Sequence, residues 1–243
     1  MGMITMVCSA KDGVGKSTAC VFLADALSDM GKRVLVIELD NGLRSLDVYA
    51  GVYGMTVFDI FDVLNGRCEP DRAIVKAPAP RKNVYVLSAP YNFESLKGEQ
   101  FVKLCNALNS HYDNILIDAS CLSDIQVAAS AVAMNAIMVA TADPAGVRDA
   151  RIVADRLKDL AVPKMRLLLS RIEPSRIALG VVPDLDFCID NIGLQLIGVV
   201  PEDDEIALSA AMGIPLEKKS LSKSVFDNIA ERLYGNDLPL AFQ

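Results

Sequence analysis

Residues 10–18 read Ala10-Lys11-Asp12-Gly13-Val14-Gly15-Lys16-Ser17-Thr18, and they decide how the rest of the chain is read. They follow the apolar run 3–8 directly and precede a segment with helical spacing of apolar residues. Two glycines let backbone N–H groups curl round phosphate oxygens, and the helix N-terminus adds favourable partial charge. Lys16 can reach the β- and γ-phosphates, and Ser17 can ligate Mg²⁺. We therefore expect residues 11–18 to line a nucleotide site.

Outward from this loop, short apolar runs alternate with helix-length segments along almost the whole chain. The runs rich in Val, Ile and Leu are residues 3–8, 34–39, 84–87, 115–117, 137–141, 166–169 and 195–200. They are continuous rather than alternating, which is typical of parallel strands covered on both faces. The pattern predicts an α/β fold: one doubly wound, mostly parallel sheet with helices on both faces, formed by residues 1–243 as a single domain.

Two helices are predicted in more detail. The helix after the loop has apolar residues at helical spacing, which puts Asp25 and Asp29 on its opposite, polar side, and Gly31 ends it. Residues 222–234 carry apolar side chains along one side, so this helix is expected to dock on the core.

Composition excludes several kinds of protein. The 243 residues carry a formal charge of −7, so no general field draws the chain to nucleic acid or anionic lipid. The six cysteines include no C-x-x-C pair, and the one histidine, His111, has no metal-ligand spacing to them. No signal peptide is evident, and the uncharged run 125–142 reads as a buried helix and strand rather than a membrane span. We expect a cytoplasmic protein with reduced thiols.

The loop departs from the common phosphate-loop motif in a way that points to one family. Position 10 is Ala where the motif has Gly, and a second lysine stands five residues before Lys16. With Gly13, Gly15 and Ser17, the two lysines resemble the deviant Walker A loop of the MinD/ParA ATPases. The resemblance implies ATP and ADP as ligands and an ATP-dependent homodimer in which Lys11 reaches the partner's nucleotide. The family usually has Gly where this chain has Asp12, so that carboxylate must turn outward or pair with Lys11.

Two further segments resemble the MinD branch of this family. Residues 38–47 (ELDNGLRSLD) resemble its switch I segment, which implies that Asp40 positions the attacking water near Mg²⁺. Asp118 ends an apolar run and matches the Walker B aspartate, which holds Mg²⁺ through water. The implied metal site is therefore Ser17, Asp40 and Asp118, and the implied catalytic residues are Lys11, Lys16 and Asp40.

The segment after Asp118 departs from the family pattern. The family usually reads D-x-P-A-G, whereas residues 118–123 read DASCLS. The missing Gly normally lets a backbone N–H approach the γ-phosphate, so we expect slow hydrolysis. Cys121 has no spaced second cysteine, and a packed thiol is preferred to an iron–sulfur ligand.

The base end of the site rests on residues near the last two strands. Arg171, Pro201 and Glu202 occupy positions that border the adenine in MinD-like proteins. The helix that starts near Pro144 matches the surface that receives partner proteins in this family, and a solvated helix face is the alternative there.

The resemblance covers nearly the whole chain and implies a MinD-like, ATP-hydrolysing dimerisation switch in spatial regulation of bacterial cell division. Protein partners of the division-site system are expected. The alternatives are a nucleotide-dependent scaffold with little or no hydrolysis and a ParA-like partition ATPase, which the acidic balance disfavours. The acidic balance and the lack of a dense Lys/Arg run lead us to expect no nucleic-acid binding. MinD proteins typically end in a short basic amphipathic helix that enters the membrane, but no Lys or Arg follows Arg232 here. Two alternatives are open: the sequence stops short of that helix, or the chain does not bind membrane by itself. Contact with the inner face of the membrane is then expected only through partners.

Overall fold

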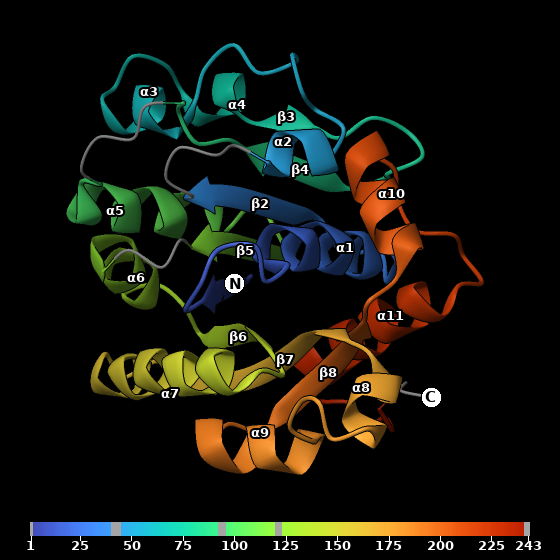
Figure 1. Cartoon of the computed structure of the whole chain (residues 1–243). Helices are drawn as coiled ribbons and strands as arrows, with labels where there is room; N and C mark the ends of the chain where they lie inside the picture. Colours follow the sequence, from blue (N-terminus) through green and yellow to red (C-terminus); the bar gives the residue numbers. More distant parts are fainter. Residues whose placement is uncertain (1, 40–44, 92–95, 120–122, 241–243) are drawn as a thin grey trace.

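The structure is a computed structural model that describes residues 2–39, 45–91, 96–119 and 123–240 (Figure 1). The strands are β1 (Met3–Ser9), β2 (Val34–Leu39), β3 (Val75–Lys76), β4 (Val84–Leu87), β5 (Asn114–Ala119), β6 (Asn135–Thr141), β7 (Lys164–Ile172) and β8 (Leu196–Pro201). The helices are α1 (Lys16–Asp29), α2 (Leu46–Tyr49), α3 (Ile60–Leu64), α4 (Pro70–Ala73), α5 (Gly98–Leu108), α6 (Ser123–Ser130), α7 (Pro144–Asp159), α8 (Pro174–Ala178), α9 (Leu185–Ile192), α10 (Asp204–Met212) and α11 (Leu221–Leu233).

All described strands belong to one sheet with the order β3-β4-β2-β5-β1-β6-β7-β8. Every pairing is parallel except that of β3 with β4. The chain winds outward from β1 to β2 and β4, returns through β5, and then continues on the other side with β6, β7 and β8. The C-terminal ends of the parallel strands β1, β2, β5 and β6 therefore lie at the same edge of the sheet, where ligands of such folds bind.

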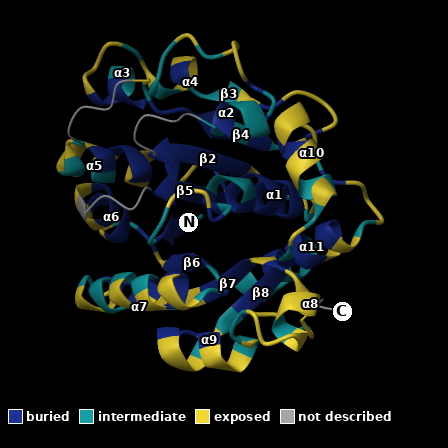
Figure 2. Cartoon of the chain, in the orientation of Figure 1, coloured by how far each residue is buried: buried dark blue, intermediate teal, exposed yellow. Residues whose placement is uncertain are grey.

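Hydrophobic cores cover both faces of the sheet. Alternate residues of β1 point to opposite sides: Met6 and Cys8 belong to the core under α5, α6 and α7, and Val7 belongs to the core under α1, α10 and α11. Figure 2 shows the buried sheet between helices whose outer surfaces are exposed. Burial on both faces explains why the strands read as continuous apolar runs.

The predicted fold class is confirmed, and one short strand was not predicted. The uncharged run 125–142 forms most of α6 and all of β6, as expected. The short edge strand β3 was missed because its two residues carry no periodic signal. In the described part of the chain, no helix is both long and apolar enough to cross a membrane.

The expectation for α11 is confirmed and one for α1 is wrong. Val225, Phe226 and Ile229 of α11 are buried, and this helix packs on α1 and β8. Asp29 is exposed as expected, but Asp25 is only 6% exposed. Helix α1 is enclosed on nearly all sides, so it has no broad polar face, and Asp25 is buried against the guanidinium of Arg81 instead.

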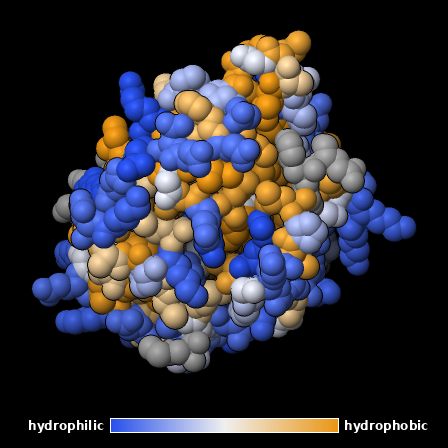
Figure 3. Space-filling view, turned by 90° about the horizontal axis from the view of Figure 1, so that it is seen from below, coloured by the Kyte–Doolittle hydropathy of each residue, from blue (hydrophilic) through white to orange (hydrophobic). Residues whose placement is uncertain are grey.

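The surface is uneven in polarity. Seen from below, hydrophilic atoms dominate the margin, while hydrophobic atoms gather round a central hollow and at one protruding corner (Figure 3). Leu179 and Val181, which lie between α8 and α9, are among the most exposed large apolar side chains of the described residues.

Candidate nucleotide site

The loop between β1 and α1 has the conformation that phosphate binding requires. Gly13 and Gly15 have φ values of 75° and 91°, in the left-handed region that favours glycine. Gly15 is the N-cap of α1, and no side chain caps the helix there. The N-terminus of a 14-residue helix therefore keeps its N–H groups and its partial positive charge for an anion.

Lys16 and Asp118 form a buried ion pair at the bottom of this loop. Lys16 Nζ lies 2.6 Å from Asp118 Oδ1, and the two side chains are 5% and 0% exposed. β1 and β5 are neighbours in the sheet, which brings the end of β5 beside the loop. A buried charge needs an opposite charge, so Lys16 can turn to a phosphate only if Asp118 gains another cation.

The surroundings of Asp118 fit that second cation. Its other oxygen, Oδ2, is fully buried and has no hydrogen-bond partner among the described residues. Ser17, the next residue after Lys16, lies in the first turn of α1 and is partly accessible. A carboxylate oxygen and a hydroxyl are oxygen ligands of the type that Mg²⁺ prefers, directly or through water. The residues present therefore fit a bound Mg²⁺ with a nucleotide phosphate.

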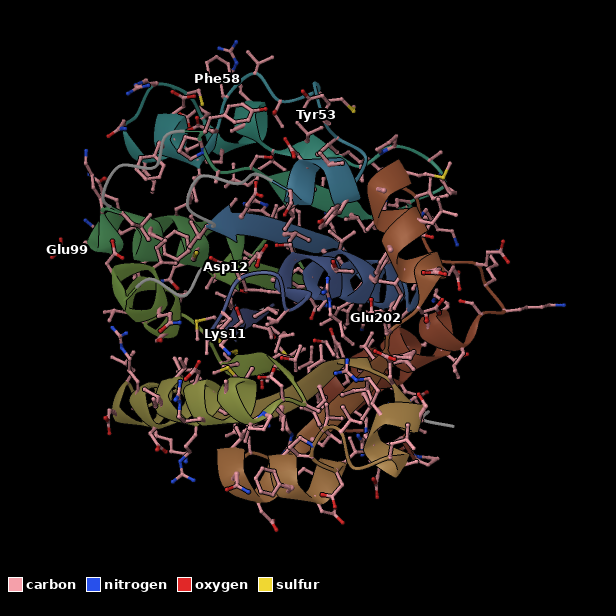
Figure 4. All side chains as sticks on the ribbon, in the orientation of Figure 1. Lys11, Asp12, Tyr53, Phe58, Glu99 and Glu202 are labelled. Atoms are coloured by element: carbon pink, nitrogen blue, oxygen red, sulfur yellow. The ribbon has the colours of Figure 1, made fainter. Side chains whose placement is uncertain are left out.

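Lys11 points away from the phosphate loop, toward α7 (Figure 4). Its ammonium lies 3.4 Å from Asp149 Oδ2 and 4.0 Å from Asp143 Oδ1. Hydrogen bonds from Arg148 and from Lys11 lower the pKa of Asp149. Asp12 is exposed, so its carboxylate turns outward, which is one of the two arrangements expected from the sequence.

Glu38 is the buried acid at the end of β2. Its Oε1 accepts N–H groups of Ser45 and Leu46 at 3.2 and 3.1 Å, and its Oε2 accepts the N–H of Ala89 at 3.3 Å. Burial raises the pKa of Glu38 to about 7, against these hydrogen bonds and with a further raising effect of Asp118. Glu38 thus anchors the start of α2, whereas Asp40, expected to act in catalysis and metal binding, lies outside the described residues.

A pocket of about 240 Å³ opens beside the phosphate loop and extends to α10. Arg171, Pro201 and Glu202, expected to border the base, line it together with Gly15 and Thr18. Arg171 Nε lies 3.8 Å from Glu202 Oε2, and Arg171 has a left-handed φ of 56°, uncommon for a residue other than glycine. Further lining residues that the sequence did not indicate are Tyr49, Ile206, Ala207, Ala210 and Ala211.

Ser170 lines the pocket and also contacts the phosphate loop. Its hydroxyl donates to the Val14 carbonyl at 2.5 Å, so the end of β7 holds the phosphate loop in place. A phosphate site and a pocket of mostly apolar lining therefore lie side by side, as a nucleoside triphosphate requires.

The structure brings together most of the predicted site residues. Residues 11–18 form the loop after β1 and the first turn of α1. Lys16 contacts Asp118, and Arg171, Pro201 and Glu202 line one pocket. The pocket residues on α2 and α10 were not predicted from the sequence. One weak sequence signal could have indicated those on α10: the uncharged stretch 206–214, which lies close to Pro201 and Glu202. The interpretation of Cys121 falls, like Asp40, on residues that are not described.

Fold and site together define a nucleotide-binding α/β protein of the phosphate-loop class. Residues 5–216 match the model of the CobQ/CobB/MinD/ParA nucleotide binding domain, and the chain belongs to this family. The septum site-determining protein MinD of Synechocystis sp. is 36% identical over 247 residues, which cover 98% of this chain and 92% of that protein.

Two solved structures agree with this assignment. MinD in the MinC:MinD cell division protein complex of Aquifex aeolicus superposes with a TM-score of 0.91 at 27% identity and covers 98% of each chain. MinD of Pyrococcus horikoshii, solved with Mg-ADP, has a TM-score of 0.84 at 26% identity and covers 96% of each chain.

Proposed function

We propose that this chain is a MinD-like ATPase switch that binds ATP with Mg²⁺, dimerises in the ATP form and acts in placing the bacterial division site. The observation that carries the proposal is the two-lysine loop at the start of α1, with Lys16 held on Asp118 and an apolar pocket beside it. Membership of the family supports ATP as the nucleotide, since MinD/ParA proteins are ATPases.

The assignment of roles follows from position. Residues 11–18 hold the phosphates, while Arg171, Pro201 and Glu202 border the base. Ser17 and Asp118 would hold Mg²⁺, which would neutralise charge at the phosphates. Asp40 is added to this metal site from the resemblance of residues 38–47 to the switch I segment, not from its position. Lys16 stabilises charge on the transferred phosphoryl group, and Asp40 orients the attacking water.

Lys11 is proposed to act between two copies of the chain. Its side chain is 39% exposed at the mouth of the site, so it is accessible to the nucleotide of a second copy. Leaving Asp143 and Asp149 costs Lys11 little, because an ion pair between such accessible groups is weak in water. Triphosphate is a stronger partner for an ammonium group than one carboxylate, so ATP favours the dimer.

Hydrolysis is proposed to be slow, and a scaffold without useful turnover is the second candidate. The departure of residues 118–123 from the family pattern is consistent with slow hydrolysis and also with a scaffold that does not hydrolyse ATP. The protein is proposed to act in the cytoplasm, with division-site proteins as its partners, and to contact the membrane through them.

Binding and turnover are tested separately by calorimetry with Mg-ATP and by phosphate release with and without Mg²⁺. The ATPase predicts saturable binding and Mg²⁺-dependent release above background. Binding without release would favour the scaffold. If Mg-ATP does not bind at all, the proposed function is wrong.

A further inference from the structure

Two short helices line the base end of the pocket, and the C-terminal ends of both contact the same buried side chain, that of Arg81. Helix α2 supplies Tyr49 to the pocket wall, and α10 supplies Ile206, Ala207 and Ala210. The two helices lie in contact on one side of the molecule (Figure 1). Arg81, which comes from the loop before β4, lies at the C-terminal ends of both.

Arg81 makes three contacts in a site that is closed to solvent. Its side chain is 1% exposed. Nη1 donates to the Ala50 carbonyl at 3.2 Å and to the Gly213 carbonyl at 2.5 Å. Nε donates to Asp25 Oδ1 of α1 at 2.8 Å. Ala50 and Gly213 are the C-cap residues of α2 and α10, so one guanidinium satisfies carbonyls at two helix ends.

The two helix ends approach as closely as backbone allows. Gly51 and Gly213 have φ values of 72° and 64°, and a Cβ built on Gly51 would lie 2.6 Å from the Gly213 carbonyl oxygen. Helices of four and nine residues have little stability of their own, so their positions depend on such contacts. Glu38 fixes the start of α2 at Leu46, and Arg81 fixes its end.

We infer that Arg81 is a positioning residue for the base end of the nucleotide site. It sets the separation of α2 and α10 and couples base binding to α2, which begins within the segment 38–47 that resembles switch I. The inference rests on the proposed function, since it takes the pocket to hold adenine. Arg81 itself is not among the described residues that line the pocket. It acts through Tyr49 at one helix end and through the α10 side chains at the other.

The test compares two ligands on the full chain: Mg-ATP, which uses both ends of the site, and Mg-tripolyphosphate, which uses only the phosphate loop. The variant R81K keeps a positive charge beside Asp25 but lacks the planar fork that serves both carbonyls. We expect R81K to weaken Mg-ATP binding about ten-fold and to change tripolyphosphate binding less than about two-fold.

A matched control is R232K. Arg232 Nη1 also donates to two backbone carbonyls, those of Leu196 and Ile197, but at the start of β8, away from the pocket. R232K should leave the ratio of the two affinities unchanged. G51A keeps the Arg81 side chain but presses a methyl group against the Gly213 carbonyl, to which Arg81 donates, so it forces α2 and α10 apart and should reproduce the selective loss even if R81K does not fold.

The outcomes separate the inference from the proposed function. If the parent chain binds tripolyphosphate but not ATP, the base pocket and with it the proposed function fail. If the parent binds ATP while R81K and G51A bind both ligands as the parent does, or lose both equally, the role of Arg81 is wrong. Loss of ATP affinity alone supports it.

Discussion

The phosphate end and the base end of the site are built in opposite ways. The phosphate end is one continuous stretch, residues 11–18, completed by Asp118 from a neighbouring strand. The base end collects side chains from α1, α2, β7, β8, α10 and α11, and only the last three of these elements follow one another directly in sequence. A local loop is specified by its own backbone, whereas an assembled pocket depends on the packing of every element around it.

The two ends also differ in how charge is handled. Lys16 and Asp118 are buried, and the charge of each neutralises that of the other. A substitution at either residue should therefore lower the stability of the fold as well as nucleotide affinity. The base pocket is mostly apolar, and the ion pair of Arg171 with Glu202 on its wall is exposed. Changes there should affect base recognition and leave the fold intact.

The largest expected effect is at the phosphate end, with K16A. Mg-ATP affinity should fall on the order of 100-fold or more, because a charge-assisted contact to two phosphates is lost. The free energy of unfolding should fall by ~3–5 kcal/mol, because Asp118 stays buried without its cation. Calorimetry and urea unfolding measure the two effects.

The double variant K16A/D118N is the control for that stability loss. It removes the uncompensated charge, so it should recover most of the unfolding free energy without recovering ATP binding. If K16A is as stable as the parent, the buried ion pair does not exist in solution.

The next effect concerns Glu38, which holds the start of α2. Its pKa is raised from 4.5 to about 7, so between these values the folded chain binds more protons than the unfolded chain. Through this group, stability is highest below pH 4.5 and falls by roughly 3 kcal/mol as pH rises to 7. Asp25, with its pKa raised to about 6 by burial despite Arg81, adds a change of the same sign.

Urea unfolding of the parent and of E38Q at pH 5 and pH 7.5 measures the Glu38 contribution. E38Q cannot ionise, so its loss of stability over this interval should be smaller than that of the parent. Equal slopes for the two proteins would show that Glu38 does not titrate there.

A smaller effect is expected at the base end, with A207F. Ala207 lines the pocket, and a phenyl ring at this position would occupy the volume in which we propose that the base binds. Mg-ATP affinity should fall about ten-fold, while tripolyphosphate affinity stays unchanged. L208F is the matched control, because the adjacent Leu208 is 61% exposed and is not among the described residues that line the pocket. Equal losses in both variants would mean that the base binds elsewhere.

The smallest effect is expected for K11M in the absence of nucleotide. Lys11 pairs with the accessible carboxylates of Asp143 and Asp149, so the melting temperature should change by no more than about 2 °C. Added salt should remove even that change. A large loss of stability would show that Lys11 has a structural role within one copy of the chain.

The contrast between the two ends explains what could be predicted from sequence. The doubly wound sheet and residues 11–18 follow from contiguous patterns, and Asp118 follows from its place at a strand end. Tyr49, Ala207 and Arg81 could not be predicted, because their roles arise only when α2, α10 and the loop before β4 come together. Asp25 was assigned to a polar face since helical spacing does not show that α11 and Arg81 enclose α1.

Light scattering of the nucleotide-bound chain tests the proposed switch most directly. With saturating Mg-ATP, the parent should be a dimer, with twice the chain mass of 26.2 kDa. With ADP it should be a monomer, with the mass of one chain. K11M should bind ATP and stay at the single mass. A parent chain that stays monomeric with bound ATP, or a K11M variant that dimerises as the parent does, would contradict the switch.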